Sequence, residues 1–493
     1  EELQRVNPFD WQRAFPHVFA EGGFDAVIGN PPYIRIQTMR EWAPDEVLSY
    51  SKNYMSASKG NYDLYVVFIE KALHLLSQRG LLGFIVPNKF FNSKYGAAIR
   101  TIISMGKHIR EIVHFGHCQV FRNATTYTSL LFLSSTPNTT FKFSKIKQID
   151  EWLSKEMDDV EFIPSFAAGP EEWTFAFGED RELLTKMNNL PLKLDSVCDI
   201  FVGLQTSADD VYLLDFVSES KDSLILQSRV LKKTIQLEKD LLHPILSGTD
   251  VARYKTPERR QYILFPYSTS DISYELIDIQ KIIADYPLTG NYLLQNRKLL
   301  ENREKGKMKT KGWHGFVYHK NMLRQNKPKV FVPRLVDSLH GSIDTNGNFY
   351  LDNVDVGGLV MKKEYENLSL HYILALLNSK LMRWYFPHIS ATFRGGWFSA
   401  NKQYLSKIPV VLVDLSKDKE YQIYNKLVNL STRMIELNQM SYETPNDKEQ
   451  HHRQINFTDA VIDRLVYELY DLTVEEIRIV ESDSQFQVQL HPE

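Results

Sequence analysis

The sequence predicts an α/β fold that begins with a mostly parallel β-sheet covered by helices on both faces. Strand and helix periods alternate over residues 24–133. The apolar runs at residues 24–28 and 81–86 are nearly continuous, as expected for strands buried on both faces. The chain has 493 residues, of which 43% are hydrophobic, so it can form roughly two to four domains with large cores.

Local patterns define each element of this first part. Residues 62–78 carry apolar side chains at helical spacing, and Gly80 stands near the expected C′ position of that helix. The elements expected in chain order are a strand at 24–28, a helix at 62–78, a strand at 81–86 that ends at Pro87-Asn88, a helix at 95–105, and strands at 109–115 and 126–133.

Changes in pattern divide the chain into four expected domains. Residues 1–140 form the α/β part, and the charged and aromatic residues 141–190 form a connecting segment. Residues 191–412 mix short strands and turns with helices, one of them near 371–386, which predicts an α+β domain. Residues 413–493 are expected to form helices with polar faces.

The composition excludes several classes of protein. The net charge is only −3, so any affinity for a polyanion must be local. The two cysteines, Cys118 and Cys198, are too few for a disulfide scaffold and fit a reducing cytoplasm. No apolar run reaches the roughly 18 residues of a membrane span. The chain starts at Glu1 and not at Met, so we expect it to be a piece of a longer product.

The turn Asn30-Pro31-Pro32-Tyr33 carries the most specific chemistry. It places an amide oxygen, the carbonyl of Pro31 and an aromatic face next to one another. Two acceptors on the hydrogens of an exocyclic amine leave its lone pair directed at an electrophile. A Pro-Pro turn between strand and helix is the alternative. The strand at 24–28 in front of the turn favours the catalytic interpretation.

Together these segments resemble the Taq-type (gamma-class) adenine-N6 DNA methyltransferases, especially the long fused type II restriction-modification enzymes. The resemblance covers nearly the whole chain. It implies the C-terminal half of a class I (Rossmann-like) methyltransferase sheet, followed by an α+β target-recognition domain and C-terminal helices. Besides the turn at 30–33, the matching segments of the first part are 61–71, 80–87 and 120–126.

The resemblance also implies roles for single residues. Asn30 and Pro31 would accept the hydrogens of the target amine, and Pro32 would shape the turn. Tyr33 and Phe121 would stack on the two faces of an extruded adenine, which helps offset the cost of extrusion. Phe68 would border the adenine of S-adenosylmethionine. Taken alone, Phe121 would be read as an ordinary core residue.

The cofactor-binding half of such a fold is missing from the sequence. The family has a Gly-rich turn after its first strand, and no such turn precedes Asn30. We therefore expect an unpaired strand edge at residues 24–28, an incomplete S-adenosylmethionine site and little activity of this piece alone. Either the missing N-terminal region or another chain would complete the sheet.

No nuclease or metal site is predicted within the chain. Glu219-Ser220-Lys221 imitates the end of a metal-nuclease motif, but no suitable Asp and strand pair accompany it. A nuclease domain, and with it Mg²⁺, is expected only if the N-terminal part carries one.

Residues 297–334 are locally basic. They contain twelve Lys or Arg against two Glu, a local excess of +10, with Trp313, Phe316 and Tyr318 interleaved. A solvated charged face is the alternative to a surface that follows DNA phosphates. The segment with Gly306 and Gly312 is expected to be a mobile loop that orders on double-stranded DNA, with contacts from Lys305, Lys307, Lys309 and Lys311.

Segments 202–209, 245–254, 376–380 and 394–398 resemble the target-recognition domain of the family. The resemblance implies Thr206, Arg253 and Arg394 as DNA contacts. Turn or cap roles are the alternative, and Ser247-Gly248 and Asn378 suit turns well. Thr473 and Glu476 have the spacing of a capping box.

Three functions are compatible with these features. The first is a site-specific DNA adenine-N6 methyltransferase of a restriction-modification system, which transfers a methyl group from S-adenosylmethionine to a flipped adenine. The second is a non-catalytic DNA-binding specificity module that works with a separate cofactor-binding chain. The third is a protein-glutamine methyltransferase, which also uses Asn-Pro-Pro-Tyr but does not need the remaining chain with its basic loop.

Overall fold

The structure is a computed structural model of the chain, and it divides into two compact units. The first unit is Glu1–Arg181 with His388–Gly396, and the second is Glu182–Pro387 with Trp397–Glu493. Each is considered by itself. The described residues are 8–482 without 59, 117, 119, 122–126, 147, 155–159, 174–179, 394–395 and 442–443.

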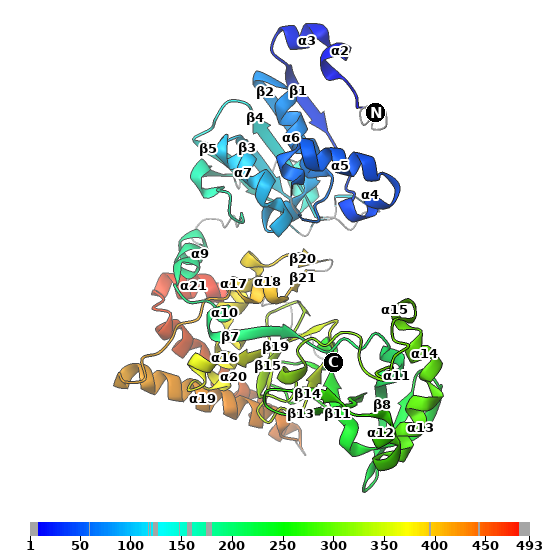
Figure 1. Ribbon diagram of the computed structural model, residues 1–493. Coiled ribbons are helices and arrows are strands. Elements are labelled where there is room, and N and C mark those ends of the chain that lie inside the picture. The colour runs from blue at the N-terminus through cyan, green and yellow to red at the C-terminus, as the bar shows by residue number, and fades with distance from the viewer. Residues whose placement is uncertain are drawn as a thin grey trace. The chain divides into compact units, whose positions relative to one another are not determined.

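A six-stranded sheet forms the centre of the first unit, with helices such as α6 and α7 packed on it (Figure 1). The strand order is β1-β2-β4-β3-β5-β6. The strands are β1 (Phe24–Gly29), β2 (Leu76–Pro87), β3 (Ile109–His114), β4 (Thr128–Ser134), β5 (Thr140–Lys145) and β6 (Val160–Pro164). The helices are α2 (Trp11–Ala14), α3 (Pro16–Ala20), α4 (Ile36–Trp42), α5 (Pro44–Asn53), α6 (Tyr65–Leu75), α7 (Ala97–Met105) and α8 (Ile149–Leu153).

Strand directions in this sheet are mixed. β1 pairs with β2 in parallel and β3 pairs with β5 in parallel, whereas β4 lies antiparallel between β2 and β3. β6 is antiparallel to β5. The predicted α/β fold is confirmed, and β1, β2, β3 and β5 run in one direction. The sheet is nevertheless less parallel than expected, because β4 inserts between two neighbours that are parallel to each other.

Gly80 does not end the preceding helix as predicted. The helix α6 ends at Leu75, and Gly80 lies within β2. The register between β1 and β2 is irregular there, because Phe24 pairs with Leu76 and Ala26 pairs with Leu81. A Cβ atom on Gly80 would come within 2.6 Å of the Phe24 carbonyl oxygen. The glycine thus allows a close approach of two strands.

The strand β1 is not buried on both faces, contrary to the expectation for residues 24–28. Within the described part of the chain it has a partner only at β2, so it is an edge strand. Its Ile28 side chain is 87% exposed. The rings of Trp11, Phe15 and Phe19 cover Phe24 at the start of the strand. The apolar side chains of β1 are therefore only partly buried within this unit.

The second unit contains two larger sheets that share a core region. One has the order β10-β9-β8-β12-β11-β18, and the other has the order β17-β15-β19-β7. The strands of this unit are β7 (Cys198–Val202), β8 (Leu213–Glu219), β9 (Ser223–Ser228), β10 (Lys233–Glu238), β11 (Leu242–Leu246), β12 (Gln261–Leu264), β13 (Tyr267–Thr269), β14 (Tyr274–Leu276), β15 (Lys329–Pro333), β16 (Leu335–Val336), β17 (Ser342–Asp344), β18 (Tyr350–Leu351), β19 (Val356–Met361) and β21 (Trp397–Ser399). The short strand β20 (Thr392–Phe393) belongs to the first unit.

Helices pack beside these sheets, and the C-terminal ones are long. The single helix expected near 371–386 is two helices, because the backbone of Ser379 is extended between them. The helices are α9 (Asp180–Asn189), α10 (Leu194–Val197), α11 (Asp209–Tyr212), α12 (Ile279–Asp285), α13 (Pro287–Gln295), α14 (Arg297–Glu301), α15 (Arg303–Gly306), α16 (Leu370–Asn378), α17 (Lys380–Ile389), α18 (Lys402–Leu405), α19 (Asp418–Gln439), α20 (Pro445–Leu469) and α21 (Val474–Ser482). None of the described helices is long and apolar enough to cross a membrane.

Candidate functional site

The turn Asn30-Pro31-Pro32-Tyr33 follows the carboxyl end of β1. The Tyr33 hydroxyl donates a hydrogen bond to the carbonyl oxygen of Ile85 on β2, at 3.0 Å. Because β1 and β2 are parallel, both strands end at the same edge of the sheet, and this bond holds the turn there. Such an edge is where open α/β sheets bind their ligands.

The polar groups of the turn are available for a ligand. Asn30 is exposed, and its side chain makes no hydrogen bond with any residue that the structure describes. Pro31 is buried and Pro32 is half-buried, so the turn itself is fixed by packing. The Asn30 amide therefore does not serve to tie down the loop.

Tyr33 is half-buried, and burial raises its pKa to about 12. The phenol is thus neutral at physiological pH. Its ring meets the ring of Tyr65 edge to face, with centroids 6.3 Å apart. Tyr33 therefore presents an aromatic group whose position is set both by the hydrogen bond to β2 and by the buried start of α6.

A partly buried chain of polar side chains continues from Tyr65, and sequence reasoning missed it. The hydroxyl oxygens of Tyr65 and Tyr95 are 2.7 Å apart, and the Tyr95 hydroxyl donates to Oδ2 of Asp63 at 3.0 Å. Burial and the neighbouring Asp63 carboxylate raise the pKa of Tyr95. Asp63 and Tyr65 belong to the segment 61–71 singled out in the sequence, but only the fold brings Tyr95 to them.

The backbone joins the same segment to the exit of the turn. The Leu64 N–H donates to the Ile34 carbonyl at 2.8 Å, and the Ile36 N–H donates to the Tyr62 carbonyl at 3.0 Å. These bonds connect the residues after Tyr33 to the residues before α6. The turn is therefore held on both sides, which favours a site that is formed before its ligand arrives.

A second polar pair lies at the carboxyl edge of the sheet. The side-chain nitrogen of Asn88, which follows β2, is 2.9 Å from Nε2 of His114, the last residue of β3. The Gly116 N–H donates to Nδ1 of the same ring at 3.0 Å. The sequence predicts only that a strand ends at Pro87-Asn88. The contact of Asn88 with His114 could not be predicted from it, because β4 lies between the two strands that carry these residues.

The two aromatic candidates Phe68 and Phe121 remain predictions. Phe68 is 41% exposed on α6, between the buried residues Val67 and Ile69. An exposed aromatic ring on a helix that is otherwise largely buried can contact a planar ligand. Phe121 is half-buried, and the residues 122–126 that follow it lie outside the described part of the chain.

In the second unit, the four lysines Lys305, Lys307, Lys309 and Lys311 are exposed. None of them forms an ion pair with a residue that the structure describes. We call residues 304–312 the lysine loop. Its four lysines alternate along the chain and outnumber Glu304, the one acidic residue of the loop, so the loop has the net positive charge that a surface for phosphate groups requires.

The wider basic stretch 297–334 is less exposed than the sequence suggests. Lys329 is fully buried and pairs with Asp344 at 3.0 Å. Arg324 pairs with Asp199, and Arg297 pairs with Glu301. The count of +10 already includes Glu301, but it overestimates the surface charge, because Asp344 on β17 and Asp199 on β7 lie outside the stretch and pair with two of its basic residues.

The surroundings of Thr206 favour a turn role, and the predicted DNA contact stays a prediction. Its side chain is buried, with 1% exposed. The hydroxyl accepts a hydrogen bond from the Ala208 N–H at 3.0 Å and donates to the Asp209 carboxylate. The residue therefore shapes the turn before α11, the alternative that the sequence left open.

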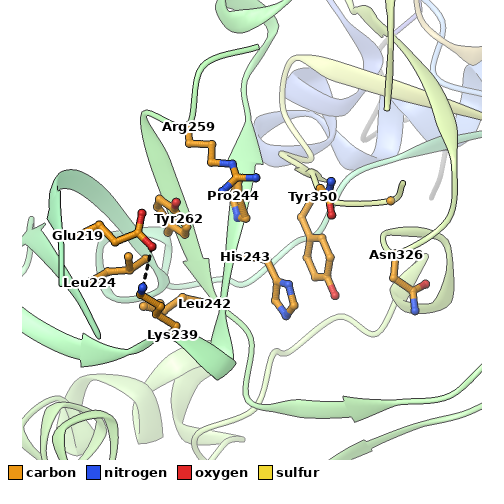
Figure 2. A pocket seen from close by; sticks show the side chains of 12 residues that line it. Glu219, Leu224, Lys239, Leu242, His243, Pro244, Arg259, Tyr262, Asn326 and Tyr350 are labelled. Atoms are coloured by element: carbon orange, nitrogen blue, oxygen red, sulfur yellow. Dashed lines mark hydrogen bonds and ion pairs between the residues drawn. The ribbon is translucent and has the colours of Figure 1, made fainter. Parts of the chain in front are cut away.

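A pocket of about 390 Å³ opens between β8, β11, β12 and the turn before β18. Figure 2 shows the ring of His243 facing that of Tyr350; the two are stacked with centroids 4.2 Å apart. On its wall, Lys239 pairs with Glu219 at 2.6 Å. Glu219 of the nuclease-like tripeptide is thus neutralised, and the described residues contain no cluster of three potential metal ligands.

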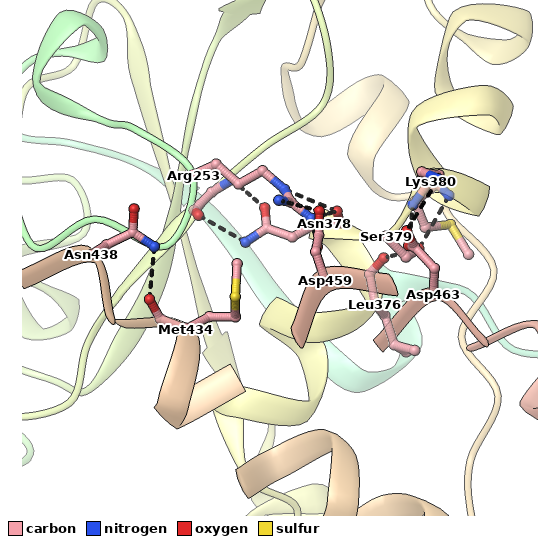
Figure 3. A network of polar contacts seen from close by, with 11 residues as sticks. Arg253, Leu376, Asn378, Ser379, Lys380, Met434, Asn438, Asp459 and Asp463 are labelled. Carbon is pink, nitrogen blue, oxygen red and sulfur yellow. Dashed lines mark hydrogen bonds and ion pairs between the residues drawn. The ribbon is translucent and has the colours of Figure 1, made fainter. Parts of the chain in front are cut away.

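Arg253 has partners within the chain that favour a structural role, and the predicted DNA contact stays a prediction. Figure 3 shows its guanidinium directed at Asp459 of α20 and at the backbone of Asn378. It forms two hydrogen bonds with the Asp459 carboxylate and two with the Asn378 carbonyl. The side chain is 23% exposed and connects α20 to the end of α16. The third candidate, Arg394, lies outside the described residues.

Two family models match separate parts of the chain. Residues 1–121 match the family described as Eco57I restriction-modification methylase, and residues 243–410 match the TaqI-like C-terminal specificity domain. The chain combines an Eco57I-type methylase part with a TaqI-like specificity domain. The predicted resemblance is thereby confirmed.

Individual relatives match a larger part of the chain than either family model does. The type II restriction enzyme and methyltransferase RM.Eco57I of Escherichia coli is 26% identical over 96% of this chain and 48% of its own length. The type II methyltransferase M.BstVI of Geobacillus stearothermophilus is 26% identical over 78% of this chain and 67% of its own length. The chain thus spans about half the length of RM.Eco57I.

The fold is similar to that of the type IIL restriction-modification enzyme MmeI, solved in complex with DNA. The TM-score is 0.58 at 11% sequence identity, over 94% of this chain and 57% of that one. The Eco57I-type sheet and the specificity domain therefore have the predicted fold class, a Rossmann-like methyltransferase sheet followed by a recognition domain.

Proposed function

We propose that this chain is part of a site-specific DNA adenine-N6 methyltransferase of a restriction-modification system, which acts on a flipped adenine in double-stranded DNA. The observation that carries the proposal is the Asn30 amide, exposed and without a hydrogen-bond partner among the described residues, beside Tyr33 at the carboxyl edge of the sheet. The match of residues 1–121 to a restriction-modification methylase supports it.

The turn would act by positioning. Oδ1 of Asn30 and the Pro31 carbonyl would each accept one hydrogen of the adenine amine, which draws the nitrogen toward tetrahedral geometry and frees its lone pair. Tyr33 and Phe121 would hold the extruded ring between them. No strong base is needed for this chemistry, in agreement with a turn that contains no titratable group except the neutral Tyr33 phenol.

The cofactor would be S-adenosylmethionine, which supplies an electrophilic methyl group when bound. Of the residues present, the exposed ring of Phe68 suits its adenine. The rest of such a site would come from strands that pair with the edge of β1, where Ile28 is 87% exposed. We therefore infer that this chain alone provides an incomplete site and has little activity, and that an N-terminal region or another chain completes the sheet. Mg²⁺ would be required only by a nuclease domain in such a region.

Residues 1–140 would form the C-terminal half of the catalytic domain, and 141–190 would connect it to the recognition domain at 191–412 and the helices at 413–493. The lysine loop would contact phosphates, which position the DNA without reading its sequence. Its lysines are exposed and form no ion pair with a described residue, which supports this role.

A DNA-binding specificity module without catalysis of its own is the second candidate. The unpaired edge of β1 favours it, because a separate cofactor-binding chain could pair there. In both candidates the same residues face the DNA.

One experiment separates these functions. The full-length gene product is incubated with duplex DNA and methyl-labelled S-adenosylmethionine, and the DNA is digested to nucleosides. N6-methyladenine is the expected product. Label in DNA only after addition of a second protein would favour the specificity module, and label in glutamine side chains of protein would contradict the proposal.

A further inference from the structure

The lysine loop has an unusual backbone. Glu304, Lys305 and Gly306 have positive φ angles of 48°, 60° and 85°. Left-handed conformations of residues other than glycine are costly and persist where the surroundings impose them. The loop that carries the exposed lysines is therefore held by contacts at its base.

Arg303, the residue immediately before the loop, makes these contacts. Only 7% of it is exposed. Its guanidinium donates hydrogen bonds to the carbonyl oxygens of Leu300 at 2.9 Å, Thr206 at 2.9 Å, Trp313 at 2.7 Å and Gly315 at 2.8 Å. Trp313 and Gly315 follow the loop, so one side chain joins both of its ends to the turn at Thr206.

Tyr212 on α11 reinforces the same junction. Its hydroxyl donates to the His314 carbonyl at 2.8 Å, and the Arg303 guanidinium lies over its ring at 5.7 Å. Arg297 lies over the buried ring of Trp313 at 5.3 Å. Contacts with Tyr212 and Arg297 thus fix the residues that follow the loop.

The chemistry of the junction requires arginine. Four carbonyl oxygens in different directions match the planar fork of a guanidinium, whereas an ammonium group has three donors at one point. Arg303 forms no ion pair with a described residue, and its guanidinium is occupied by these backbone carbonyl oxygens.

We propose that Arg303 is a positioning residue for DNA binding, which holds the four lysines of the loop in the arrangement that meets the phosphate backbone. This inference rests on the proposed binding of duplex DNA. A loop that is held before binding loses less conformational entropy when it contacts its partner. The segment 202–209, which the sequence marks for DNA recognition, would then serve as the anchor of the loop through the Thr206 carbonyl.

The test measures duplex binding by fluorescence anisotropy over a series of salt concentrations, with the chain of 493 residues. Arg303→Met should weaken binding about fivefold to tenfold at low salt, because the lysines lose their fixed arrangement. Arg303→Lys should not restore it. In a background with Lys305, Lys307, Lys309 and Lys311 changed to Gln, Arg303→Met should have no further effect. Arg229→Met, at an exposed arginine paired with Asp215, is the matched control and should bind as the unaltered chain does.

Tyr212→Phe provides a second, milder variant if Arg303→Met does not fold. It removes only the hydroxyl bond, and it should give a smaller loss that also disappears in the Gln background. An equal loss with and without the loop lysines would overturn the proposal, because Arg303 would then act through the general fold. Absence of salt-dependent duplex binding by the unaltered chain would overturn the proposed function as well.

Discussion

Arg253 and Asp459 are 206 residues apart in sequence, yet the guanidinium of one binds both carboxylate oxygens of the other. The same guanidinium holds the carbonyl of Asn378 at the end of α16. In addition, Asp463 on α20 accepts a hydrogen bond from the Lys380 N–H at 2.8 Å. The helix α20 is thus attached to the recognition domain by charged groups that are mostly buried.

Arg253→Ala should destabilise the second unit without changing how DNA affinity depends on salt. Removal of one partner leaves the half-buried Asp459 carboxylate uncompensated, which costs about 2 kcal/mol in the free energy of unfolding. Urea unfolding and duplex binding of the same variant provide the measurement. A folded variant of normal stability with a flatter salt dependence would restore Arg253 as a phosphate contact.

Neutralisation of Lys305, Lys307, Lys309 and Lys311 to Gln should weaken duplex binding. Each lost phosphate contact should reduce the slope of log affinity against log salt by about 1. Anisotropy titrations at several salt concentrations measure the slope. The matched control changes four exposed lysines elsewhere in the same unit to Gln and should leave the slope nearly unaltered: Lys232, Lys233, Lys255 and Lys363. Equal slopes in both variants would show that the loop has no special role.

His243 should make the stability of the second unit sensitive to acid. Burial lowers its pKa from 6.5 to about 4, so the folded state binds the proton less readily than the unfolded state. The stabilisation is therefore complete above about pH 6.5 and is lost as the pH falls toward 4. The His243→Phe variant keeps a ring against Tyr350. It should lose about 3 kcal/mol less free energy of unfolding than the unaltered chain when the pH falls from 7 to 4. Parallel stability curves for the two proteins between pH 7 and 4 would refute the assignment.

The chain of 493 residues should not bind S-adenosylmethionine tightly. Among the described residues β1 pairs only with β2, so the proposed cofactor site lacks there the strands that would build its other half. Isothermal titration calorimetry measures this directly, with the full-length gene product as the positive control. Low-micromolar binding by the shorter chain would mean that the residues present suffice.

The sequence predicts best what depends on neighbouring residues. The apolar run before Asn30 forms β1, and the helical spacing around Tyr65 forms α6. The capping box of Thr473 and Glu476 is confirmed, since each backbone N–H donates to the other side chain. Ser247 likewise forms a capping box with Asp250, which agrees with the turn role that the sequence left open for it.

What the sequence could not predict depends on partners far along the chain. The position of β4 between β2 and β3 is decided by strand pairing, which local patterns do not specify. Arg253 looks like a contact residue until the fold gives it Asp459, 206 residues further along the chain, as a partner. Arg303 is one of twelve basic residues in its stretch, and only the carbonyl oxygens around it distinguish its role.

Methyl transfer by the Asn30→Ala variant of the full-length gene product tests the role of the Asn30 turn most directly. The control is Asn446→Ala, at an exposed asparagine on α20. We expect Asn30→Ala to form almost no N6-methyladenine while its DNA affinity stays within about twofold of the unaltered enzyme, because the amide acts mainly in the transition state. Turnover equal to that of the control would contradict the proposed role of the turn.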